Sequence, residues 1–217
     1  MFVAIPSQAD TIQQLGLLDD EETLLGSFLR SVSHDLRSPL LTLSLSAELL
    51  GDASPTDERE QVAREAIAHG LQDMERMLDA VTGVSRARRR ILADGPMPLA
   101  AVLDAVRIVS EAPLIEAALS IDARAAGDAL RSLGPDAEVL VAPDHQGVLL
   151  SAALPDSIAG VEGSCVVALL GDLHTYAGTP VVALAVAEVV LARQGATLRC
   201  EGAQVHMRLP LADGNPA

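Results

Sequence analysis

Aromatic residues and lysine are almost missing from this chain. Its 217 residues include no Trp and no Lys, one Tyr and two Phe. Base stacking on aromatic rings is the usual means of binding single-stranded nucleic acid, so this scarcity nearly excludes that function. The formal net charge of −15 at pH 7 repels phosphate backbones and anionic lipids. We therefore expect no nucleic-acid partner, no membrane partner and an aliphatic core.

Cysteines and long apolar runs are also scarce. Cys165 and Cys200 form no Cys-x-x-Cys pair and no disulfide framework, and we expect both to be reduced thiols in the core. Residues 1–6 lack the basic start and the apolar stretch of a signal peptide. The longest apolar run, 181–192, contains Glu188 and is shorter than the ~20 residues of a membrane span. The sequence predicts a soluble, cytoplasmic protein.

Two segments of the chain have the spacing of long amphipathic helices. After a polar leader over 1–19, apolar positions alternate in steps of four and three from residue 20 onwards. Residues 51–56 are a turn signal, and the spacing then resumes until a run of arginines at 86–90. These positions predict an antiparallel helical hairpin over 20–92, with apolar seams at Leu25, Leu29, Val32, Leu36, Pro39, Leu43, Ser46 and Leu50, and at Ile67, Leu71, Met74, Leu78 and Val81.

A single hairpin of this kind cannot bury its apolar face. Two copies can do so as a four-helix bundle around a two-fold axis. We therefore expect an obligate homodimer through residues 20–90.

The pattern changes after a Gly-Pro-rich boundary at 94–98. Helices and strands are mixed without strict alternation, which predicts a small α/β sandwich over 97–211 and a tail over 212–217. The predicted helices are 99–111, 145–154 and 180–194, and the predicted strands are 118–123, 138–142, 165–170, 197–200 and 204–209. The fold class is therefore α+β, with a dimeric helical hairpin followed by this sandwich.

The string Ser33-His34-Asp35-Leu36-Arg37-Ser38-Pro39-Leu40 lies on the first predicted helix. His34 is two residues from the seam positions on either side, a rotation of about 200°, so its ring points into solvent. A neutral imidazole nitrogen can attack phosphorus, and a neighbouring base would raise its nucleophilicity. Arg37 could steady phosphate charge, and Pro39 should bend the helix just after the histidine.

This string resembles the phosphoacceptor box of two-component sensor histidine kinases. The resemblance implies that His34 is the phosphoacceptor and that Asp35 is the acid/base residue. Ser38 stands where family members with phosphatase activity often carry Thr or Asn.

A fainter resemblance covers the C-terminal half and implies a degenerate ATPase domain. Residues 142–151 resemble the opening of the family's ATP-binding helix, with Ser151 at the position of the magnesium-binding Asn. Residues 178–185 resemble a glycine-rich box in which Pro and Val replace the glycines, and 171–174 are the nearest match to the adenine-reading box. Residues 172–178 leave no length for an ATP lid, and Asn215 in the tail is the only Asn of the chain. The resemblance thus implies no bound ATP and no cofactor, with magnesium held by a partner receiver domain.

Taken together, these features predict a histidine-containing phosphotransfer protein. It would relay phosphoryl groups via His34 to and from the aspartates of response-regulator receiver domains, with an upstream hybrid kinase as a further partner. Two alternatives stay open, a diverged but active histidine kinase and a pseudokinase adaptor without phosphotransfer. The remaining histidines have no acidic or Cys partners at metal-ligand spacing, so we expect no metal site.

Overall fold

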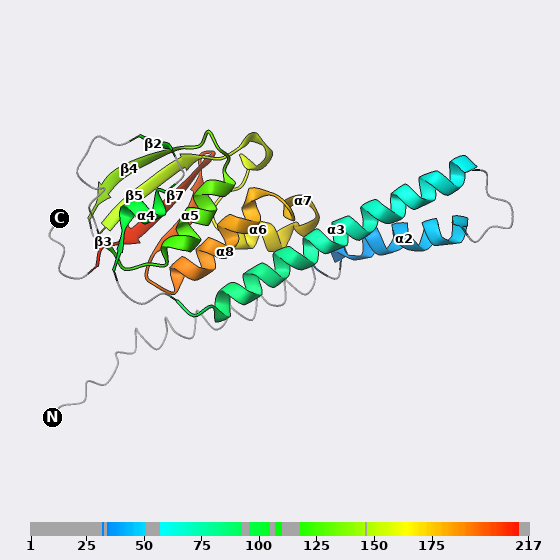
Figure 1. Cartoon of the computed structure of the whole chain (residues 1–217), viewed down its shortest axis with the longest axis horizontal. Coiled ribbons are helices and arrows are strands. Elements are labelled where there is room, and N and C mark those ends of the chain that lie inside the picture. Colours follow the sequence, from blue (N-terminus) through cyan, green and yellow to red (C-terminus); the bar gives the residue numbers. More distant parts are fainter. Residues whose placement is uncertain are drawn as a thin grey trace, which may run out of the picture.

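The computed structural model describes residues 32, 34–50, 57–92, 96–104, 107–109, 118–145 and 147–212. A hairpin of helices α2 (Arg37–Leu50) and α3 (Asp57–Arg89) projects from a domain built on a β-sheet (Figure 1). Acidic residues occupy the first turn of α3 and arginines its last turn, which complements the helix dipole at both ends. The predicted antiparallel hairpin is confirmed. The predicted leader, most of the tail, and Leu25 and Leu29 lie outside the described residues.

The two helices of the hairpin meet along small residues. On α2 the predicted seam is buried or half-buried, with Pro39 and Ser46 the most enclosed. On α3 the buried positions in the part that faces α2 are Ala63 and Gly70, seven residues apart. A Cβ at Gly70 would lie 3.4 Å from Cγ of Leu43, so this glycine sits at the closest approach of the helices.

The predicted seam of α3 is therefore only partly right. Ile67, Met74 and Val81 are half-buried, whereas Leu71 and Leu78 are 55% and 50% exposed. The small residues that permit close packing, rather than the large leucines, face α2 within one chain.

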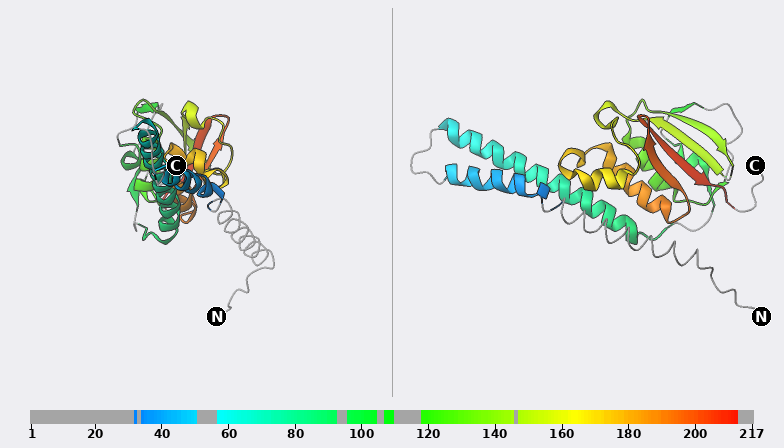
Figure 2. Two further views of the ribbon diagram at one scale, coloured as in Figure 1. Left: turned by 90° about the vertical axis from the view of Figure 1, so that its right-hand side faces the viewer. Right: turned by 180° about the vertical axis from the view of Figure 1, so that it is seen from behind.

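The C-terminal half of α3 belongs to the core of the sheet domain. Met77, Ala80, Val84 and Ala87 form one hydrophobic cluster with α8 (Pro180–Ala192) and the sheet. Nη1 of Arg193 donates to the carbonyl oxygens of Ala87 and Arg90, at 3.1 and 2.8 Å. These bonds satisfy carbonyl groups that the end of a helix leaves without partners. Hairpin and sheet domain thus share one helix and one core (Figure 2).

The central sheet has five strands in the order β2-β4-β5-β7-β6. β2 and β4 are parallel, and the other neighbours are antiparallel. Burial alternates along β6 and β7, as expected when helices cover one face of a sheet. The strands are β2 (Arg107–Val109), β4 (Glu138–Asp144), β5 (Gly147–Ala153), β6 (Thr197–Glu201) and β7 (Gln204–Pro210).

Three helices cover the inner face of this sheet: α5 (Ala123–Ser132), α6 (Cys165–Gly171) and α8 (Figure 1). Short elements complete the domain. They are β1 (Met97–Pro98) paired with β3 (Ala118–Leu119), α4 (Leu99–Val102), the 3-10 turn η2 (Asp156–Ile158) and α7 (Leu173–Tyr176). The α+β class is confirmed, as are helix 180–194 and the strands at 138–142, 197–200 and 204–209 to within a few residues.

Two predicted helices are wrong. The described residues of segment 99–111 form the four-residue α4 and then β2, which adds to the sheet edge beside β4. The segment 145–154 is β5, which lies between β4 and β7 with Val148 and Leu150 fully buried. In both places, pairing with a strand distant in sequence overrides the local helical preference.

Two predicted strands are also wrong. The strand 118–123 stops at Leu119, and Ala123 begins α5, which the sequence reading missed. The carboxylate of Asp122 accepts hydrogen bonds from the amides of Arg124 and Ala125 and so starts this helix. The strand 165–170 is helix α6, which the Oγ of Ser164 caps by accepting from the amide of Val167. In each case a capping side chain stabilises the start of a helix where a strand was predicted.

No helix that the structure describes is both long enough and apolar enough to cross a bilayer.

Candidate functional site

His34 lies in the helical turn that leads into α2, on the side of the hairpin nearest the sheet domain. Its side chain is 81% exposed, as the off-seam spacing predicts, whereas the side chain of Asp35 is only 13% exposed. Nδ1 of His34 and Oδ1 of Asp35 are 3.0 Å apart. The candidate phosphoacceptor and the candidate acid/base residue therefore form a hydrogen-bonded pair.

This pair assigns the two ring nitrogens to different tasks. A carboxylate oxygen is an acceptor, so in neutral His34 the proton lies on Nδ1, where it is donated to Asp35. Nε2 then carries the lone pair in the exposed part of the ring. Such an arrangement can attack an electrophilic phosphorus.

The second oxygen of Asp35 binds the sheet domain. Oδ2 accepts a hydrogen bond from the backbone amide of Leu173, at 3.0 Å across 138 positions of the sequence. Leu173 begins α7, and its side chain is 1% exposed. This contact could not be predicted from the sequence, because a backbone amide carries no residue signature.

Arg37 and Ser38 lie exposed in the first turn of α2. Arg37 is three residues from His34, the spacing at which neighbouring side chains share a helix face. Pro39 is buried in the same turn and has no amide to donate to the helix.

The segments that resembled nucleotide-binding boxes differ from the family pattern in secondary structure or in side-chain contacts. Residues 142–151 form the β4–β5 hairpin, so Ser151 is not on a helix, and its Oγ lies 2.9 Å from Nδ1 of His206 on β7. Gly178 has φ +83°, and a Cβ there would lie 2.9 Å from Cδ of Arg76 on α3. The Arg76 side chain thus lies against the backbone of this glycine.

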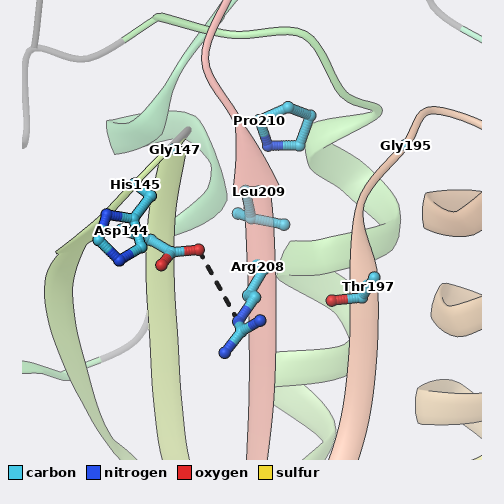
Figure 3. Close-up of a pocket in the computed structure, with 8 residues that line it drawn as sticks. All are labelled: Asp144, His145, Gly147, Gly195, Thr197, Arg208, Leu209 and Pro210. Atoms are coloured by element: carbon cyan, nitrogen blue, oxygen red, sulfur yellow. Dashed lines mark ion pairs between the residues drawn. The ribbon is translucent and has the colours of Figure 1, made fainter.

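A shallow depression of about 320 Å³ lies at one end of the strands β5, β6 and β7 (Figure 3). Its polar groups include His145, Thr197 and an ion pair of Arg208 with Asp144, with Nε and Oδ2 3.8 Å apart. His69 and His174 are exposed elsewhere. Within the described residues, no three His, Cys, Asp or Glu side chains gather as metal ligands would.

The two cysteines meet in the core, although 35 positions separate them. Both are buried, and their Sγ atoms are 3.1 Å apart, with Cys165 starting α6 and Cys200 on β6. The hydrogen bond with Cys200, together with burial, raises the pKa of the Cys165 thiol. The expected core thiols are thus neighbours, which the spacing in sequence did not indicate.

Comparisons with known proteins agree with the hairpin. Residues 24–90 match the family model of the His Kinase A (phospho-acceptor) domain. No curated protein matches the chain at a significant level.

Among solved structures, the chain is similar to the histidine kinase AdeS of Acinetobacter baumannii, at 14% identity and a TM-score of 0.36 over 84% of this chain and 98% of that one. It is also similar to a bacterial phosphotransferase, at 10% identity and a TM-score of 0.34 over 95% of this chain and 98% of that one. The match assigns a His Kinase A (phospho-acceptor) domain to residues 24–90, consistent with a protein of the two-component histidine kinase family.

Proposed function

We propose that the chain is a histidine-containing phosphotransfer protein of a two-component phosphorelay. It relays phosphoryl groups via His34 to and from response-regulator aspartates without using ATP. The observation that carries this proposal is the exposed His34 ring, hydrogen-bonded through Nδ1 to Asp35 on a phospho-acceptor domain. Receiver domains and an upstream hybrid kinase are the proposed partners, in the cytoplasm.

Each transfer is a displacement at phosphorus. Nε2 of His34 attacks the phosphorus of an aspartyl phosphate, and the bond from phosphorus to the partner's aspartate oxygen breaks. The electron pair of that bond leaves on the partner's carboxylate. The Nδ1 proton stays on the ring, where the Asp35 carboxylate compensates the positive charge. Arg37 is placed to steady the phosphoryl oxygens, and the magnesium ion belongs to the receiver domain.

The region 97–211 is, on this proposal, a degenerate ATPase-like domain. A triphosphate binds where its oxygens can reach backbone amides that no side chain covers. In this segment Val181 is fully buried, and the Arg76 side chain lies against the backbone of Gly178. The chain offers no Asn besides Asn215 to hold magnesium. The residues present therefore do not fit Mg-ATP.

A homodimer is the proposed assembly. Large apolar side chains remain about half exposed on the hairpin, at Leu40, Leu41, Leu45, Leu49, Val62, Leu71 and Leu78. Burying the exposed half of each such side chain contributes on the order of 1 kcal/mol. A second hairpin would supply that burial in a four-helix bundle.

Labelled phosphoryl transfer tests the function. The protein is incubated with a receiver domain carrying labelled aspartyl phosphate, and label should appear on the wild type but not on His34→Ala. The label should be acid-labile and base-stable, as a phosphoramidate is. Because the ring is exposed, His34→Ala should change the unfolding free energy by under ~0.5 kcal/mol.

A second arm uses labelled ATP without any receiver. No label should transfer, and titration calorimetry should show no binding tighter than about a millimolar. Label from ATP on His34 would identify a kinase instead. Uptake of label by His34→Ala would place the acceptor elsewhere and contradict the proposal.

A further inference from the structure

The carboxylate of Asp35 is held from both sides. Oδ1 lies 3.0 Å from Nδ1 of His34, and Oδ2 accepts from the amide of Leu173 at 3.0 Å. The two oxygens of one side chain thus connect the exposed imidazole with the sheet domain.

The amide of Leu173 is a fixed donor. The Leu173 side chain is 1% exposed and belongs to the hydrophobic core that α3, α6 and α8 share. Asp172 accepts from the amide of Thr175 and so fixes the start of α7 next to it. The position of the Asp35 carboxylate is therefore determined by the packing of the sheet domain as well as by α2.

Building on the proposed phosphotransfer by His34, we propose that the Leu173 amide is a positioning group of the phosphotransfer site. It orients the Asp35 carboxylate so that Oδ1 binds Nδ1–H of His34. In the neutral ring that bond places the proton on Nδ1 and the lone pair on Nε2, where it can attack phosphorus, since the partner of one ring nitrogen determines which nitrogen carries the proton. The sheet domain thereby contributes a group to the site on the hairpin.

A proline at position 173 removes the donor selectively. Leu173 is the first residue of α7, where proline is tolerated, and Asp172 has φ −147° and ψ 77°, outside the α region that a following proline disfavours. Leu173→Ala is the matched variant, since it loses the same buried side chain but keeps the amide. Comparing the two variants separates the hydrogen bond from the packing.

We expect transfer from a phosphorylated receiver to be about tenfold slower or more in Leu173→Pro than in Leu173→Ala, the scale of one hydrogen bond to a charged group. In an Asp35→Ala background the two variants should be equal, because the bond has lost its acceptor. Equal rates with Asp35 present, or faster transfer in Leu173→Pro, would overturn the proposal.

Nitrogen NMR of the His34 ring gives a readout that packing alone would not change. The wild type and Leu173→Ala should carry the neutral ring proton on Nδ1, and Leu173→Pro should shift it in part to Nε2. This measurement needs no phosphate, so it tests the hydrogen bond between Leu173 and Asp35 even if His34 accepts no phosphoryl group. A His34 that accepts no phosphoryl group would refute only the proposed function. Unchanged ring shifts in folded Leu173→Pro would contradict the positioning role.

Hydrogen exchange tests the same bond without proline and remains decisive if Leu173→Pro does not fold. The Leu173 amide should exchange about tenfold faster or more in Asp35→Ala than in the wild type, because its acceptor is gone. It should change little in His34→Ala, which keeps that acceptor. Exchange that is insensitive to Asp35 would overturn the proposal.

Discussion

The two ends of α3 are in opposite environments. Over its first half, the described part of the helix packs on α2 through small residues, and Leu71 remains about half exposed. Toward its end Met77, Ala80, Val84 and Ala87 are buried in the core of the sheet domain. The sheet domain closes its core within one chain, whereas the hairpin leaves apolar surface for a second one. Stability thus rests mainly on the sheet domain, and the hairpin presents the proposed phosphotransfer site and the proposed dimer surface.

Asp35→Asn should affect chemistry far more than stability. The amide carries no charge to compensate the positive charge that the ring gains on phosphorylation, so transfer should slow by about 10²–10⁴-fold. The rate of label transfer from a receiver domain measures this loss, with thermal unfolding as the control. A comparable rate in the variant would mean that Asp35 serves only the contact with the sheet domain.

Leu184→Ala should affect stability far more than the site. Leu184 on α8 is fully buried, and the cavity should cost about 2–5 kcal/mol in unfolding free energy. Val167→Ala on α6 is the matched control, since Val167 is 54% exposed and should cost under ~0.5 kcal/mol. Denaturant unfolding followed by circular dichroism compares the two. Similar losses would show that the core of the sheet domain is not where stability resides.

Leu71→Glu should weaken the dimer. Leu71 on the hairpin and Val167 on the sheet domain are almost equally exposed, at 55% and 54%. A charge buried between two hairpins without a partner is costly, so Leu71→Glu should raise the dissociation constant by at least about tenfold. Val167→Glu should leave it unchanged, and sedimentation measures both. A wild type that is monomeric and folded at micromolar concentration would remove the basis for the dimer.

Arg193→Ala should weaken the attachment of the end of α3 to the sheet domain, with a smaller loss of free energy than the changes above. It removes hydrogen bonds to two carbonyl groups at the end of α3, which on an exposed side chain contribute about 1 kcal/mol in total. Arg199→Ala on β6 removes the same charge from another exposed position and should cost less than ~0.5 kcal/mol. Hydrogen exchange in the last turn of α3 should rise in the first variant only. Equal exchange in both variants would mean that apolar packing alone holds the end of α3 on the sheet domain.

The sequence by itself determined what depends on short-range spacing. Heptad steps specified the hairpin, and the off-seam position of His34 predicted its exposure, because helix geometry fixes which side chains share a face. The apolar run after Thr179 and the alternation near the C-terminus specified α8, β6 and β7. Asp122 before an alanine-rich run is a sequence signal for the start of α5, although no helix was predicted there.

Tertiary structure decided what depends on groups far apart in the chain. Residues 147–153 became a strand because β4 and β7 bind on either side, although their apolar residues also suit a helix. Cys165 met Cys200 because Gly163, two residues earlier, forms an isolated β-bridge with Cys200. Asp35 met the amide of Leu173 for a similar reason, since packing of α3 on α8 brings α7 beside the start of α2. Every residue except proline has a backbone amide, so only the fold can select the one that binds a given carboxylate.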